Sequence, residues 1–176
     1  PNLTVLRPCD AMETAEAWEI AMASESSPVL MALSRQGLPA QRKTVADENL
    51  SAKGAYVLRE ADGARDVTLI ATGSEVEIAI NAADKLAESG VKAAIVSAPS
   101  FELFSQQSDA HRAEVLGQAP RVGVEAAIRM SWGAMLRPND GFVGMTGFGA
   151  SAPAADLYKH FGITAEAVAE TARKLI

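Results

Sequence analysis

The feature that most constrains the fold is a short apolar run followed by a helical pattern, which recurs along the chain. The run at 67–71 has the length of a strand that is buried on both faces of a sheet. Behind it, apolar residues recur at helical spacing on one face, at Val76, Ala79, Ile80, Ala83, Leu86 and Ala87. A second apolar run follows at 93–97. Strand and helix alternating in this way are typical of a mostly parallel sheet with helices on both faces.

The same alternation continues to the end of the chain and indicates a fold class. Strands are predicted at 55–59, 67–71, 93–97, 121–125 and 141–145. Helices are predicted behind Ser74, at 151–161 and at 164–176. The segment 61–64 is turn material short enough to join the first two strands as antiparallel neighbours. We therefore expect an α/β fold, a three-layer α/β/α sandwich with a mostly parallel, about five-stranded mixed sheet.

The N-terminal segment predicts a separate β-α-β unit. Asp10 and Glu13 form a D-x-x-E pattern, in which the Asp side chain accepts from backbone amides and the Glu reaches back to the cap. This pattern predicts a helix at 11–23, between strands at 4–8 and 29–33. One such unit buries too little apolar surface to fold alone, so we expect it to complete a sheet whose other strands lie upstream.

A polar stretch separates this unit from the sandwich. Residues 37–52 show neither the two-residue nor the 3.6-residue hydrophobic period, and we interpret them as a linker. The chain then divides into an N-terminal unit at 1–36, this linker, and a domain at 53–176. The opening Pro1-Asn2-Leu3 has no initiator Met and no leader-like stretch, so we expect the numbering to start inside a longer polypeptide.

Composition and charge disfavour several classes of partner. The chain of 176 residues has 22 acidic and 16 basic side chains, and its formal net charge of -6 repels phosphate backbones and anionic lipid surfaces. Nucleic acid and membranes are therefore poor partners, and no apolar run reaches the ~20 residues that span a bilayer. One cysteine and two histidines offer neither an internal disulfide nor the ligand spacing of structural zinc. A reducing, cytoplasmic setting fits this inventory best.

Arg35 is the one residue for which a ligand is expected. It follows the apolar run 29–33, and ligands of open α/β sheets bind at the carboxyl ends of strands. Its planar guanidinium suits a phosphate or a carboxylate. A plain salt bridge within the protein explains the same residue equally well at this stage. No residue of the chain is predicted to be catalytic or to bind a cofactor or metal.

Several acidic residues have structural interpretations. Ser74 and Glu77 form an S-x-x-E pattern, which predicts a capping box. Glu13, Glu16 and Glu19 recur every three residues and predict an exposed acidic helix face. Glu125, at the end of the predicted strand 121–125, is expected to be partly buried and must then be paired or protonated.

Five motifs of this chain, in order and at matching intervals, resemble those of transketolase. They are Arg7-Pro8-x-Asp10, Leu33-Ser34-Arg35-Gln36-x-Leu38-Pro39, Lys53-Gly54-x-Tyr56-Val57-Leu58, Ile70-Ala71-Thr72-Gly73-Ser74-Glu75-Val76 and Phe148-Gly149-x-Ser151-Ala152-Pro153-Ala154. The resemblance covers essentially the whole chain. It corresponds to the last part of that enzyme: the end of the pyrimidine-binding domain, the linker and the C-terminal domain.

The resemblance implies an enzyme of the pentose phosphate pathway that transfers two-carbon ketol units between sugar phosphates. In that family thiamine diphosphate carries the carbanion chemistry, with a divalent metal, Mg or Ca, holding its diphosphate. The arginine of the S-R-Q motif, here Arg35, is implied to bind the sugar phosphate. Family members are homodimers. Their G-D-G motif for the diphosphate and metal does not occur in this chain.

Two other readings stay open. Deoxyxylulose phosphate synthase and the β chain of the 2-oxo acid dehydrogenases share the fold of this domain, although they lack the L-S-R-Q-x-L-P and F-G-x-S-A-P-A strings. A stand-alone regulatory or interaction module of the same fold is a rival from another class. The intact mass of the expressed gene product distinguishes the module from an enzyme of several hundred residues.

The 176 residues alone are predicted to bind no thiamine diphosphate and to turn over no substrate, because the motifs that hold the cofactor in the family do not occur in them. Calorimetric titration of the chain with the cofactor and Mg²⁺ measures this directly. Binding in the micromolar range would contradict the prediction.

Overall fold

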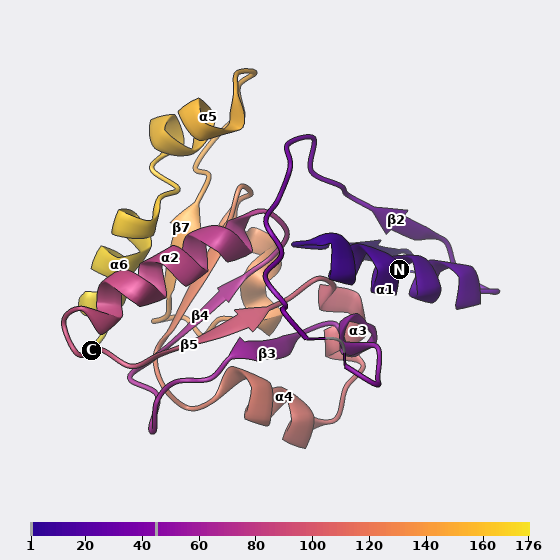
Figure 1. The fold of residues 1–176 in the computed structure, drawn as a ribbon, viewed down its shortest axis with the longest axis horizontal. Coiled ribbons are helices and arrows are strands. Elements are labelled where there is room, and N and C mark those ends of the chain that lie inside the picture. The colour runs from indigo at the N-terminus through magenta and orange to yellow at the C-terminus, as the bar shows by residue number, and fades with distance from the viewer. Residues whose placement is uncertain (1, 45) are drawn as a thin grey trace.

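The computed structural model describes residues 2–44 and 46–176, and Figure 1 shows a small N-terminal unit docked on a larger sheet domain. The unit contains strand β1 (Thr4–Leu6), helix α1 (Ala11–Ala23) and strand β2 (Val29–Met31). The two strands pair in parallel, with Leu6 opposite Met31. The predicted helix at 11–23 and both flanking strands are therefore confirmed.

The larger domain is built on a five-stranded sheet with the order β3-β5-β4-β6-β7. Its strands are β3 (Tyr56–Arg59), β4 (Val67–Ala71), β5 (Ala93–Ser97), β6 (Arg121–Glu125) and β7 (Gly141–Gly144). Its helices are α2 (Glu75–Ala87), α3 (Phe101–Ser105), α4 (Asp109–Leu116), α5 (Ala154–Phe161) and α6 (Ala165–Arg173), with 3₁₀ turns η1 (Leu50–Lys53) and η2 (Arg129–Ala134). All pairs are parallel except β3 with β5, as expected for the mixed sheet of a three-layer α/β/α sandwich.

The predicted hairpin between the first two strands of this domain is wrong. β4 pairs in parallel with β5 on one side and with β6 on the other, so neither of its edges is open to β3. β3 instead forms the antiparallel edge of the sheet beside β5. A four-residue turn signal reports only that the chain changes direction, whereas the partner of a strand is decided by the whole sheet.

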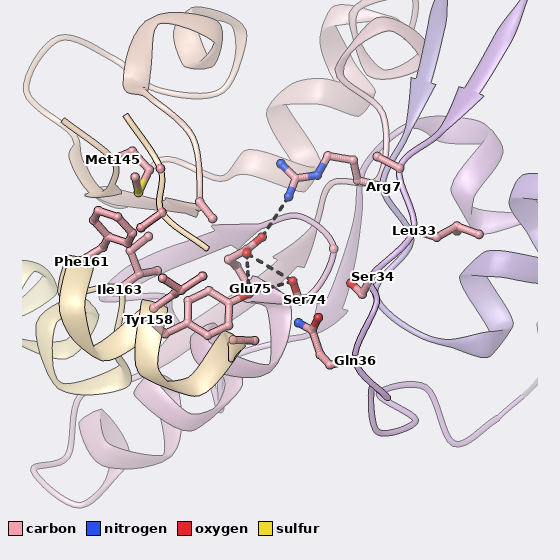
Figure 2. Close-up of a pocket in the computed structure, with 17 residues that line it drawn as sticks. Arg7, Leu33, Ser34, Gln36, Ser74, Glu75, Met145, Tyr158, Phe161 and Ile163 are labelled. Atoms are coloured by element: carbon pink, nitrogen blue, oxygen red, sulfur yellow. Dashed lines mark hydrogen bonds and ion pairs between the residues drawn. The ribbon is translucent and has the colours of Figure 1, made fainter. Parts of the chain in front are cut away.

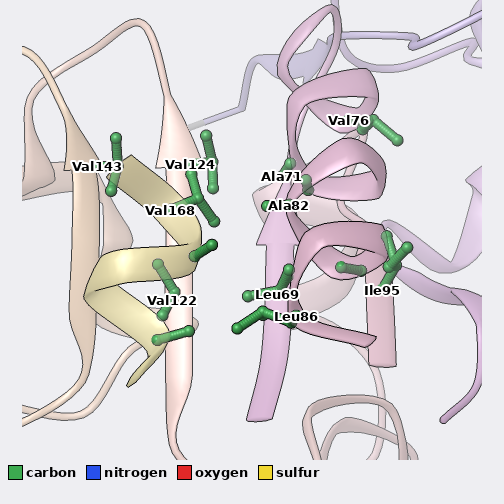
Figure 3. Packing of buried hydrophobic residues seen from close by; sticks show 14 of the residues in the cluster. Leu69, Ala71, Val76, Ala82, Leu86, Ile95, Val122, Val124, Val143 and Val168 are labelled. Atoms are coloured by element: carbon green, nitrogen blue, oxygen red, sulfur yellow. The ribbon is translucent and has the colours of Figure 1, made fainter. Parts of the chain in front are cut away.

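Successive side chains of the central strand, β4, pack into two separate hydrophobic cores, one on each face of the sheet. Leu69 packs with α2 and α6 on one face of the sheet (Figure 3), and Ile70 packs with α3, α4 and η2 on the other. Both side chains are fully buried. Each such burial stabilises the fold by about 1.5–3 kcal/mol. Because β4 is covered on both faces, its sequence is apolar except for Thr68 and shows no alternation.

A buried carboxyl joins the N-terminal unit to the sheet domain. Glu13 of α1 is fully buried and accepts hydrogen bonds from the Tyr56 hydroxyl (2.7 Å) and the Ser97 hydroxyl (2.6 Å) of the sheet domain. Its second oxygen accepts from the backbone N–H of Cys9 at 2.7 Å. No cation forms an ion pair with Glu13 in the described part of the chain, and burial raises the pKa of this carboxyl above its ordinary value.

The predicted exposed acidic face of α1 is therefore wrong for two of its three residues. Glu13 is buried against the sheet domain, and Glu16 forms an ion pair with Arg42 at 2.7 Å. Glu19 accepts a hydrogen bond from Asn49. A three-residue spacing shows which residues share a helix face, but not whether a neighbouring domain covers that face.

Replacing Glu13 by Gln is expected to remove a pH dependence from folding. A carboxyl whose pKa is raised in the folded state gives stability that is present below its unfolded pKa and is lost as pH rises through the folded value. The unfolding free energy of the parent relative to Glu13→Gln should therefore fall as pH rises from the ordinary glutamate pKa, 4.5, through the higher folded value. Urea unfolding of both chains across this range measures the difference. A difference that stays constant with pH would show that Glu13 titrates normally.

Candidate functional site

The carboxyl ends of β4, β5, β6 and β7 meet at one edge of the sheet. The chain leaves β4 toward β5 and then crosses to β6 on the opposite side of β4. This reversal between β4 and β6 is a topological switch point, where open α/β sheets leave a crevice that commonly holds ligands. Here the N-terminal unit docks on that edge.

Arg7 is the residue of the N-terminal unit that enters this crevice. Its backbone N–H donates to the Pro99 carbonyl at 2.8 Å, and its carbonyl accepts from the Gly73 N–H at 3.0 Å. Gly73 turns the chain from β4 into α2 at a φ of 55°, a left-handed conformation that glycine adopts without strain. The backbone of Arg7 is therefore fixed to the loops that follow β4 and β5.

The guanidinium of Arg7 bridges two buried carboxylates, one just beyond the end of β4 and one at the end of β6. It pairs with Glu75 at 3.2 Å and with Glu125, which are 1% and 5% exposed. Glu125 also accepts from the indole N–H of Trp132 at 2.7 Å. The predicted pairing of Glu125 is confirmed. Sequence reasoning did not assign a role to Arg7, although the residue stands in the first of the five motifs.

Glu75 connects this ion pair to the C-terminal helices. Its free oxygen accepts hydrogen bonds from the Tyr158 hydroxyl at 2.7 Å and the Ser74 hydroxyl at 3.2 Å (Figure 2). Burial raises the pKa of Glu75, and the Arg7 guanidinium opposes that rise. The arrangement holds a buried acid between a cation and two hydroxyl groups.

The predicted capping box of α2 is wrong. Ser74 has helical backbone angles (φ -60°, ψ -23°), and its side chain makes no capping hydrogen bond. A capping serine has extended backbone angles, which direct its hydroxyl at the free amides of the first turn. The Ser74 hydroxyl instead donates to Glu75 and lies 2.8 Å from the Tyr158 hydroxyl.

A cavity of about 610 Å³ lies between the two parts of the molecule beside this cluster. Figure 2 shows Ser34 and Gln36 on one side of it and Ser74, Glu75 and Tyr158 on the other. Its apolar wall comes from the C-terminal segments: Ala126, Met145, Ala154, Leu157, Phe161 and Ile163. The volume is within the usual range for small-molecule sites, about 300–1,000 Å³.

Arg35 stands four residues beyond the end of β2, at the carboxyl side of the two-stranded sheet. Its side chain is exposed, and within the described residues it forms no ion pair and no hydrogen bond. Its neighbours Ser34 and Gln36 line the cavity, and Arg35 itself does not. The plain salt bridge that the sequence left open is therefore not formed within residues 2–44 and 46–176.

The described residues contain no site that fits a metal ion. Among them, no three His, Cys, Asp or Glu side chains converge as ligands. No helix in residues 2–44 and 46–176 is long and apolar enough to cross a membrane.

The geometry defines an open α/β/α sandwich whose carboxyl edge docks a β-α-β unit through a buried ion pair. A family model described as the transketolase-like C-terminal domain matches residues 54–164. The chain belongs to the transketolase family.

Curated relatives match along the whole chain. A transketolase of Cereibacter sphaeroides is 63% identical over all 176 residues, which are 27% of its own length. Transketolase 1 of Escherichia coli is 43% identical over the whole chain, again 27% of that protein. The chain thus spans about a quarter of the length of the curated relatives it matches.

Solved structures show the same fold at similar identity. A transketolase from Leishmania mexicana is 40% identical with a TM-score of 0.89, over 99% of this chain and 25% of that one. A transketolase from Pichia stipitis in complex with sedoheptulose-7-phosphate is 36% identical with a TM-score of 0.90, over 99% and 25%. The arrangement of the N-terminal unit on the sheet domain is therefore shared with these proteins.

Replacing Arg7 by Met is expected to destabilise the chain by about 3 kcal/mol, because two buried carboxylates lose the one cation that pairs with them among the described residues. Arg59→Met is the matched control, since Arg59 pairs with Asp84 where both side chains are exposed, and such pairs contribute about 0–1 kcal/mol. Chemical unfolding measures both variants. Equal losses would mean that the Arg7 pairs contribute no more than a surface ion pair.

Proposed function

We propose that this chain is the C-terminal part of an enzyme that transfers two-carbon ketol units between sugar phosphates. The support is its membership in the transketolase family, with identities of 43–63% to curated transketolases along the whole chain. The proposal includes thiamine diphosphate and a divalent metal, Mg or Ca, in the full-length enzyme. When bound, the cofactor supplies a stabilised carbanion for the transfer.

The residues described here do not fit the cofactor's metal, because no cluster of three ligands exists among them. No step of the reaction is therefore assigned to cofactor or metal contacts of this chain. The division into 1–36, 37–52 and 53–176 and a cytoplasmic homodimer belong to the same proposal. The single cysteine, Cys9, is buried, which fits a reducing compartment.

The role proposed for this chain in the reaction is to bind the phosphate of the sugar through Arg35. The observation that carries it is the exposed guanidinium at the carboxyl side of β2, which no described side chain neutralises. A related transketolase, from Pichia stipitis, was solved with a sugar phosphate, sedoheptulose-7-phosphate. A guanidinium offers two parallel N–H donors to phosphate oxygens, so it orients the sugar as well as attracting it.

Arg35→Ala in the full-length enzyme is expected to raise KM for phosphorylated sugars. The expected loss of binding free energy is about 2–4 kcal/mol. The value of kcat should change little, because the phosphate is remote from the reacting carbons. Steady-state kinetics with phosphorylated and unphosphorylated sugars measures both parameters. Lys174→Ala, at the exposed end of α6, is the control for loss of one positive charge. An equal loss with unphosphorylated sugars would refute the assigned role.

A further inference from the structure

The loop that carries Arg35 is held only at its ends. Residues 33–40 form no hydrogen bond to any described part of the chain, and they contain neither helix nor strand. A cavity of about 280 Å³ lies beneath this loop, between Leu33, Ser34, Gln36 and Leu38 above and the start of α1 below. The loop is therefore not packed down along its length, and its two attachment points decide where Arg35 lies.

The first attachment is part of the two-stranded sheet. The Ala32 N–H donates to the Leu6 carbonyl at 2.9 Å and extends the pairing of β1 with β2 by one residue. Arg7 follows Leu6, the last residue of β1, and its side chain and backbone are bound to the sheet domain. This first end of the loop is therefore fixed to that domain.

The second attachment is the carboxylate of Asp10. Its Oδ2 atom accepts the backbone N–H groups of Gln41 (3.0 Å) and Arg42 (3.1 Å), at the far end of the loop. Its Oδ1 atom accepts the Glu13 N–H at 2.8 Å and so caps α1. One side chain, 4% exposed, therefore ties the loop to the helix start.

Arg42, one of the two residues that Asp10 binds, is also held by contacts of its own side chain. The Arg42 guanidinium pairs with Glu16 at 2.7 Å and lies 5.4 Å from the centre of the Tyr56 ring. The Asp10 contacts thus connect the loop to a fixed point shared by α1 and β3. Without them, Gln41 and the backbone of Arg42 would join the unbound residues 33–40, and only the Arg42 side chain would hold this end of the loop.

We propose that Asp10 is a positioning residue that holds Arg35 in place for the phosphate of the substrate, an inference that rests on the proposed function. A charged group held in advance binds without losing conformational freedom on binding, whereas a mobile one loses affinity for the same contact. Asp10 therefore acts through the loop and touches no substrate itself.

Asp10→Ser in the full-length enzyme separates the two roles of this side chain. Serine retains a capping oxygen for α1 but has no second oxygen for Gln41 and Arg42. KM for phosphorylated sugars should rise about 10-fold, while kcat and the KM for unphosphorylated sugars stay unchanged. Asp10→Asn is the second variant, because its amide keeps the shape and supplies one acceptor where the structure uses two.

The same measurement in an Arg35→Ala background gives a double-mutant cycle. If Asp10 acts through Arg35, Asp10→Ser should have no further effect on KM once Arg35 is absent. An Arg35→Ala variant without a phosphate-selective defect would overturn the proposed function. A selective Arg35→Ala defect, with either no effect of both Asp10 variants or an equal effect in the Arg35→Ala background, would overturn the positioning role alone.

Ser108→Ala is the control for loss of a helix cap. Ser108 caps α4 in the sheet domain by accepting the His111 N–H at 3.2 Å, and it belongs to neither the loop nor its attachments. Its loss should lower thermal stability and leave both KM values unchanged. A similar phosphate-selective rise in KM for Ser108→Ala would show that the Asp10 effect is only a loss of stability.

Discussion

The placement of the N-terminal unit depends on the pairing of carboxylates that the sheet buries at its carboxyl edge. Glu75 lies just beyond the end of β4 and Glu125 is the last residue of β6, and burying carboxylates without a cation is costly. Arg7, which lies outside the sheet domain, supplies the cation. The ion pairs that compensate the two buried carboxylates therefore also dock the N-terminal unit on the sheet domain. Glu13 makes the complementary contact, with hydroxyl donors of the sheet domain in place of a cation.

This arrangement puts structural and binding roles on neighbouring residues. Only Pro8 and Cys9 separate Arg7, which forms the ion pair, from Asp10, whose carboxylate ties down the Arg35 loop. The guanidinium for which we propose phosphate binding needs a fixed distance from the rest of the site, and its loop has no packing of its own to supply it. The rigidity therefore comes from the two docked parts of the molecule.

Local sequence patterns were sufficient to predict the fold class, the strands, and helices α1, α2, α5 and α6. The apolar run of β4 and the helical face of α2 reflect burial on both faces of a sheet, which is a local property of the sequence. The partner of β3 could not be predicted in this way, because strand order depends on contacts between residues far apart in the chain. The same limit applied to α1, whose acidic residues were interpreted as exposed because the domain that covers Glu13 begins 40 residues later.

The residues of the candidate site also differ in whether their roles depend on neighbours in the sequence or on distant residues. Arg35 was singled out because it follows an apolar run, and its ligand role stays a prediction, whereas Arg7 and Asp10 act through groups that lie at least 30 residues away. Cys9, between these two, is 2% exposed, and burial together with the nearby Glu13 raises the pKa of its thiol. The reactive thiolate is thus suppressed while the two parts stay docked. Alkylation of this one sulfur consequently reports on their separation.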